Sequence, residues 1–158
     1  MLKLSRRDLL SSTLLAGAAC AAGTPRKLGI PGPFLGRVVE VANPATIVSG
    51  KYQRDDGRDT MRKGMMELTG APSWQEAWKF FFQPGDVVGV KLNPVGRPAV
   101  MSAPEVFLEI VEGLKAAGVK PRDIVAYDRY KDEFLGAGFD KWLPEGVRWT
   151  YGTGKPHP

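Results

Sequence analysis

Cysteine and histidine are nearly absent from this sequence of 158 residues, which contains one of each, Cys20 and His157. A single thiol cannot form a disulfide framework, a CxxC zinc knuckle or a Cys-ligated iron–sulfur cluster, and a single imidazole cannot build a histidine-based metal site. The sequence also lacks a GxSxG motif, so a Ser–His catalytic triad has no support. These classes are therefore excluded within this chain, and its cofactor, if it uses one, is left unknown.

The charge balance does not favour nucleic acid as a partner. The chain has 22 Lys and Arg residues against 17 Asp and Glu residues, a net charge of +5. No stripe of Lys and Arg interleaved with aromatic residues is present, although nucleic-acid-binding surfaces usually have one. The 43% of hydrophobic residues is close to the average of a globular domain, and the 19 Gly and 13 Pro residues imply many turns.

The first 22 residues have the pattern of a cleaved export signal. Two adjacent basic residues, Arg6 and Arg7, precede an uncharged stretch over residues 9–22. This stretch is too short for a membrane-spanning helix, which needs about 20 apolar residues. Residues 5–10, SRRDLL, resemble the twin-arginine export motif. The resemblance implies the twin-arginine translocase as a partner and a periplasmic or other extracytoplasmic location after cleavage.

Two processing routes remain open at the end of this leader. The small residues around Cys20 favour cleavage near residues 19–21. The small residues 17–19 directly before Cys20 also allow lipidation of that cysteine. In either case we expect membrane contact only through the signal peptide or a lipid on Cys20.

The rest of the chain is expected to consist of a linker and one domain. Residues 23–36 are rich in Pro and Gly and predict an extended linker, and residues 37–158 predict an α/β domain. The first elements expected in this domain are short: a β-prone run over 37–41, a possible strand at 47–48, a charged loop over 51–60 and a helix over 60–68 that ends at Gly70.

A capping box predicts the next helix. Ser73 and Glu76 have the spacing of an N-cap residue and its N3 partner. Apolar residues then recur on one helical face, which indicates packing in the core: Trp74, Ala77, Trp78 and Phe81. Residues 83–86, QPGD, have the signature of a type II turn.

A β-loop-α-β unit follows. Residues 87–92 form a nearly continuous apolar run, which is typical of a strand covered on both faces. A second capping box, Ser102 to Glu105, opens a helix that ends near Gly118, and residues 124–127 predict another buried strand. The crossover is long enough for the two strands to pair in parallel. The pattern places apolar residues on one side of the helix and its glutamates, Glu109 among them, on the other. A short helix at 132–137 and a strand at 147–151 complete the expected elements.

The candidate binding residues lie at the carboxyl ends of the two predicted strands. Lys91 and Asn93 end the first strand, and Asp128 follows the second. The start of the Ser102 helix, with its unpaired N–H groups, and Arg97 in the intervening loop are expected at the same edge. This set favours a crevice for a small anionic molecule. An alternative is equally open: a structural ion pair between Lys91 and Asp128, with Asn93 fixing the turn. No residue is assigned a catalytic role.

Residues 85–130 resemble a bacterial and archaeal family, domain-of-unknown-function family 362, in its branch with twin-arginine leaders. The features that carry the resemblance are the strand running into Lys91-x-Asn93-Pro94, the Ser102-x-Pro104-Glu105 helix start, and the strand at 124–127 followed by Asp128. Members of this family are generally longer, and some carry cysteine clusters that this sequence does not contain. The resemblance therefore implies an architecture and a crevice, without a reaction.

Together these patterns predict an α/β fold with a parallel, or mixed, sheet, crossover helices and an incomplete three-layer architecture. Because few helices are expected, we expect one face of the sheet to be poorly covered and the chain to be the N-terminal part of a longer protein. The expected function is an exported protein that binds an anionic small molecule. Whether it is an enzyme, a non-catalytic binding or assembly protein, or a purely structural one is left open.

Overall fold

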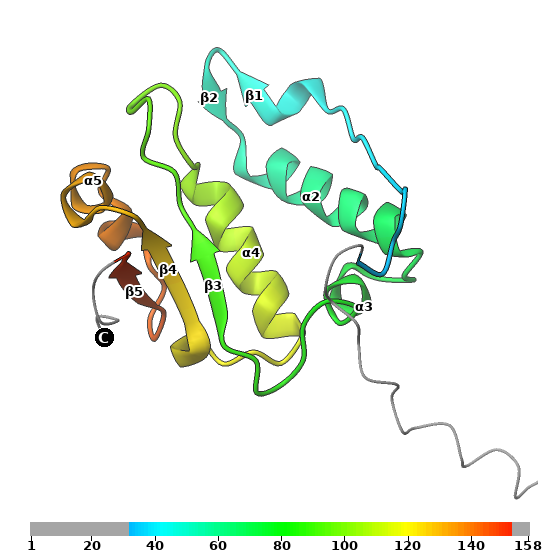
Figure 1. Ribbon diagram of the computed structural model, residues 1–158. Coiled ribbons are helices and arrows are strands. Elements are labelled where there is room, and N and C mark those ends of the chain that lie inside the picture. Colours follow the sequence, from blue (N-terminus) through cyan, green and yellow to red (C-terminus); the bar gives the residue numbers. More distant parts are fainter. Residues whose placement is uncertain (1–31, 153–158) are drawn as a thin grey trace, which may run out of the picture. The chain divides into compact units, whose positions relative to one another are not determined.

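The computed structural model of the chain describes residues 32–152 (Figure 1). The helices and strands belong to one compact unit that begins at Gly36. The predicted leader and most of the predicted linker lie outside the described residues, so the structure does not test the export signal.

A parallel sheet of three strands confirms the predicted α/β fold. Its order is β3 (Val88–Lys91), β4 (Ile124–Asp128) and β5 (Arg148–Tyr151), and both neighbouring pairs are parallel. The register places Val90 of β3 opposite Ala126 of β4. The predicted pairing of the strands on either side of the Ser102 helix is therefore confirmed.

The crossovers between the strands are helical, because each parallel connection must return along the sheet. Helix α4 (Pro104–Ala116) joins β3 to β4, and α5 (Lys131–Gly136) with the 3-10 turn Phe139–Trp142 joins β4 to β5. The core between them is formed by fully buried side chains of α4, β4, α5 and the 3-10 turn: Phe107, Val111, Leu114, Ile124, Phe134 and Phe139. The predicted helix at 132–137 and strand at 147–151 correspond to α5 and β5.

The core lies on one face of the sheet. Val88, Val90, Ile124 and Ala126 belong to the hydrophobic cluster, whereas the alternating residue Gly89 does not. Strand β3 accordingly alternates between half-buried and exposed residues. The prediction that this strand is covered on both faces is wrong, because both crossover helices pack on the same side and a continuous apolar run does not show which face is covered.

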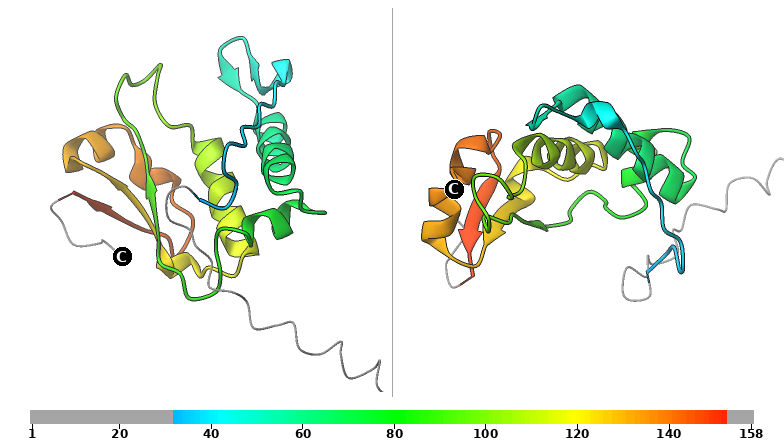
Figure 2. Two further views of the ribbon diagram at one scale, coloured as in Figure 1. Left: turned by 45° about the vertical axis from the view of Figure 1, so that its right-hand side comes forward. Right: turned by 90° about the horizontal axis from the view of Figure 1, so that it is seen from above.

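The other helices form a layer against α4. Helix α2 (Arg54–Thr69) and the short α3 (Trp74–Trp78) both contact α4, and the views in Figure 2 show α4 between α2 and the sheet. A two-stranded antiparallel hairpin, β1 (Ile47–Val48) and β2 (Lys51–Tyr52), precedes α2. One face of α4 therefore packs against the sheet, and another packs against α2.

Two expectations for the start of the domain are wrong. Residues 37–41 form no strand among the described residues, and Val38 is 91% exposed. Residues 51–60 are not a loop, since they contain β2 and the first turns of α2. Acidic residues in that first turn, Asp55 and Asp56, interact favourably with the positive end of the helix, so the charged stretch is a helix start. The predicted end at Gly70 is confirmed by its left-handed conformation, with φ 73°.

The two predicted capping boxes differ in outcome. Ser73 is the N-cap of α3 and its side chain accepts a hydrogen bond from the N–H of Glu76 at 3.3 Å. Helix α3 is shorter than the predicted face, which extended to Phe81. At α4 the N-cap is Ala103 and no side chain caps the helix. The prediction for Ser102 is wrong because its hydroxyl bonds to the preceding strand end.

A glycine makes the close contact between α3 and α4 possible. The ring of Trp78 lies directly over Gly113, where a Cβ atom would collide with it. Trp78 is 6% exposed, so this contact places a large aromatic side chain within the core.

Candidate functional site at the carboxyl ends of the parallel strands

The predicted contact between Lys91 and Asp128 is present. The Lys91 ammonium, at the end of β3, contacts Oδ1 of Asp128 at the end of β4. It also donates a hydrogen bond to the carbonyl oxygen of Leu92 at 2.8 Å. The Lys91 side chain is 46% exposed and the Asp128 side chain only 3%. The cation is thus held in place while much of its side chain stays open to solvent.

Asp128 is a covered carboxylate with few partners. Its second oxygen, Oδ2, is inaccessible and has no hydrogen-bond partner within residues 32–152. Its backbone is fixed separately, because the Asp128 carbonyl accepts a hydrogen bond from the N–H of Gly152 at 3.0 Å. A buried carboxylate is costly unless it is paired, so the charge of Asp128 depends on Lys91.

Asn93 and Ser102 close the loop between β3 and α4. The N–H of Asn93 donates to Oγ of Ser102 at 2.8 Å, and the N–H of Ser102 donates to the carbonyl oxygen of Asn93 at 2.9 Å. These two bonds hold the start of α4 beside the end of β3. The sequence correctly places both residues at this edge, and the structure gives them a role in positioning the loop.

Arg97 bridges this loop to the next crossover helix. Its guanidinium donates a hydrogen bond to the carbonyl oxygen of Glu133 at 2.9 Å and lies against Gly136, both in α5. This bond uses one of the five N–H donors of the guanidinium and helps to hold the loop beside α5. The use of Arg97 as a second anion-binding group stays a prediction.

A cavity of about 340 Å³ is lined by the β1–β2 hairpin, the loop before α4 and the first residues of α4. Ser102, Tyr52 and Glu105 are among the residues that line it. Burial, with a smaller contribution from the Glu105 carboxylate, raises the pKa of Tyr52 above its usual 10.0. The negative charge of Glu105 disfavours an anion in this cavity, so Lys91 offers the more favourable side of the edge.

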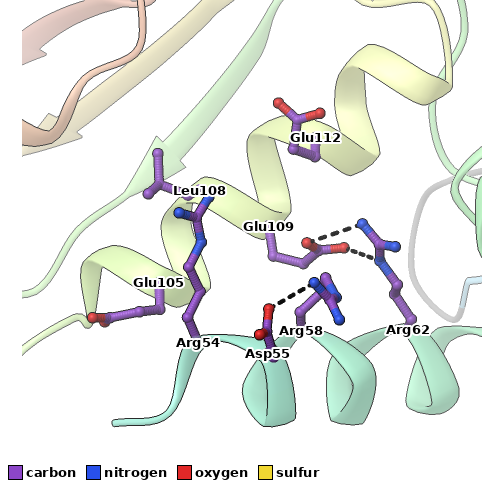
Figure 3. A pocket seen from close by; sticks show the side chains of 8 residues that line it. All are labelled: Arg54, Asp55, Arg58, Arg62, Glu105, Leu108, Glu109 and Glu112. Atoms are coloured by element: carbon purple, nitrogen blue, oxygen red, sulfur yellow. Dashed lines mark hydrogen bonds and ion pairs between the residues drawn. The ribbon is translucent and has the colours of Figure 1, made fainter.

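A second pocket, of about 330 Å³, lies between α2 and α4 and is lined by charged side chains (Figure 3). Arg62 donates two hydrogen bonds to the carboxylate of Glu109, at 2.6 and 3.3 Å, and its guanidinium lies 3.9 Å from the centre of the Trp74 ring. Glu109, which the sequence pattern places on the polar side of α4, is only 7% exposed. Because α2 covers this face of α4, the helical pattern of α4 alone could not reveal the pair.

The described residues add no metal site or membrane segment. Within residues 32–152, no three side chains of His, Cys, Asp or Glu come together as metal ligands do. None of the helices in this part of the chain has the length and apolar character needed to cross a bilayer.

Comparison with known proteins gives no match: no protein-family model, no curated protein and no solved structure is significantly similar to this chain. The resemblance to family 362 and to the twin-arginine leader therefore stays a prediction from the sequence motifs.

Proposed function

We propose that this chain is an exported protein that binds a small anionic molecule at the carboxyl edge of its parallel sheet, with Lys91 as the charged contact. The observation that carries the proposal is the hydrogen bonding of the Lys91 ammonium. An ammonium has three N–H donors, and Asp128 and the Leu92 carbonyl use two of them. One donor remains for a ligand on a side chain that is 46% exposed.

The partners of Lys91 support this use. Asp128 and the Leu92 carbonyl fix the position of the ammonium before any ligand arrives, which reduces the side-chain entropy lost on binding. Asn93 is exposed beside it, and its backbone is held by Ser102. The carboxyl ends of parallel strands are also where open α/β sheets usually bind their ligands.

Binding without catalysis fits the geometry better than an enzymatic step. Asp128 is covered by the surrounding structure, so it positions Lys91 and does not reach a ligand directly. We therefore favour a non-catalytic binding protein, with an exported enzyme as the alternative. Membership of family 362 and export through the twin-arginine translocase belong to the same proposal and rest on the sequence motifs alone.

The test is binding of inorganic phosphate and citrate, measured by calorimetry on the mature chain. The Lys91→Met variant should bind at least about tenfold more weakly, which corresponds to about 1.4 kcal/mol. The Lys91→Arg variant keeps the positive charge and should retain part of the affinity.

The matched control is Lys115→Met. Lys115 is 45% exposed and pairs with Glu112 at 2.8 Å on α4, so it resembles Lys91 in exposure and pairing but lies away from the sheet edge. Its loss should leave the affinity unchanged. Equal affinity of the wild type and Lys91→Met for both probes, with the variant shown to be folded, would contradict the proposal.

A further inference from the structure

The face of the sheet opposite the core forms a second surface, which includes the position of Lys91. Side chains alternate between the two faces of a strand, so the register defines which residues share a face. One face belongs to the core. We call the other the open face; its positions in the three strands are Gly89, Lys91, Val125, Tyr127, Arg148 and Thr150.

The open face combines apolar surface with accessible edges. Tyr127 is 37% exposed, and Val87, which precedes β3, is 69% exposed. The Tyr127 ring lies across Gly89, at 3.2 Å from the position of a Cβ atom there, so the missing side chain makes room for a flat aromatic platform. Parallel sheets are almost always covered on both faces, and this platform is suited to such a cover.

Charge on this face is of one sign. Lys91 and Arg148 are cationic, and the six open-face positions include no carboxylate. The Nε of Arg148 is shielded and has no hydrogen-bond partner within residues 32–152, so part of the donor capacity of this guanidinium is unused. Asp128 lies on the opposite face of β4 and is occupied by Lys91. A partner that brings carboxylates would complement this pattern.

The width of the face limits the shape of that partner. Three strands at a spacing of about 4.8 Å extend over roughly 10 Å, which is about the diameter of one α-helix with its side chains. A second copy of this face is disfavoured, because it would bring cations against the same cations. These two arguments select a single acidic helix.

We propose that the open face docks one amphipathic α-helix of another protein, with an apolar stripe over the exposed side chains of Tyr127 and Val87 and flanking Asp or Glu side chains near Arg148. This interaction does not depend on the proposed anion binding, because its centre is Tyr127 and Arg148 and not the Lys91 ammonium.

The experiment uses two synthetic helical peptides with the same Leu and Ala stripe. One has Glu and the other Lys on its polar positions, and binding to the full chain is measured by fluorescence anisotropy. The Glu peptide should bind at least about tenfold more tightly than the Lys peptide. Arg148→Glu should reverse the preference, and Tyr127→Ser should weaken binding of the Glu peptide about tenfold.

A matched control is Lys120→Glu, which makes the same kind of charge change at an exposed position before β4. It should leave the preference intact. If Arg148→Glu does not fold, as judged by circular dichroism, Arg148→Gln should still reduce the preference for the Glu peptide by a factor of at least three.

Equal affinity for the two peptides, or no binding of either peptide, would overturn the proposal. A dimer in sedimentation velocity that Tyr127→Ser dissociates would also overturn it, because the open face would then bind a second copy of this chain. Phosphate binding, measured on the Arg148 and Tyr127 variants, should be unchanged. This separates failure of the docking surface from failure of the Lys91 site.

Discussion

Replacing Lys91 by methionine should destabilise the fold because it leaves Asp128 without its ion pair. The Asp128 side chain is 3% exposed, whereas Lys91 is 46% exposed. Breaking a fully buried pair costs about 3–5 kcal/mol, and a surface pair contributes only about 0–1 kcal/mol. A pair with one buried and one half-exposed member lies between these limits, so we expect a loss of about 2–3 kcal/mol.

The two members of the pair should not be equivalent. Asp128→Asn leaves a half-exposed ammonium that water can solvate, so its cost should be about 1 kcal/mol, smaller than that of Lys91→Met. The double variant, Lys91→Met with Asp128→Asn, contains no unpaired buried carboxylate. It should therefore be more stable than Lys91→Met alone by about 1–2 kcal/mol. A second substitution that restores stability is the specific signature of a stranded buried carboxylate.

Urea unfolding followed by circular dichroism measures these differences, and the midpoint should fall without a change in slope. By thermal unfolding, a loss of 2–3 kcal/mol in a domain of this size corresponds to a decrease of roughly 8–12 °C. The reasoning is refuted if Lys91→Met loses less than about 0.5 kcal/mol, or if the double variant is no more stable than Lys91→Met.

The remaining predictions concern packing, pH and export. Gly113→Ala should destabilise the protein by about 1–3 kcal/mol, since its Cβ collides with the Trp78 ring. Gly64→Ala in α2, whose Cβ would lie 3.6 Å from Val41, should instead stabilise the protein by about 0.5–1 kcal/mol. Similar effects of the two substitutions in chemical unfolding would contradict the close packing at Gly113. Because the pKa of Tyr52 is raised above 10.0, the unfolded chain releases this proton first as the pH rises. The corresponding stability is present below pH 10.0 and is lost as the pH rises through the folded pKa. Tyr52→Phe should therefore lose less stability than the wild type as the pH rises above 10.0, and parallel profiles would count against this account. Replacing both Arg6 and Arg7 by Lys should keep a folded fluorescent reporter in the cytoplasm; undiminished export of the reporter would exclude the twin-arginine route.

Local patterns predicted the central unit of the fold well. The apolar runs that became β3 and β4 and the amphipathic helix between them contain their own signals, and the length of the crossover determines parallel pairing. The prediction of a loop over 51–60 is wrong, because acidic residues are equally typical of a solvated loop and of a helix start. The contact of α2 with α4 then stabilises the helix, and that contact is not visible in the local sequence.

The candidate site was only partly predictable for a related reason. Strand direction alone placed Lys91 and Asp128 at one edge. The roles of Arg97 and Ser102 depend on how the loop between β3 and α4 folds, and their partners, the Glu133 carbonyl and the Asn93 backbone, lie 36 and 9 residues away. Backbone acceptors are present at every residue, so side-chain chemistry could not identify them. The burial of Glu109 likewise follows from the position of α2.

The most direct test of the central claim is nuclear magnetic resonance of the lysine ammonium groups in the unmodified chain during titration with phosphate and citrate. The account predicts that the Nζ signal of Lys91 shifts and saturates with at least one of these anions, while that of Lys115, which is equally exposed, stays nearly constant. Equal, unsaturated shifts of the two lysines with both anions would contradict it.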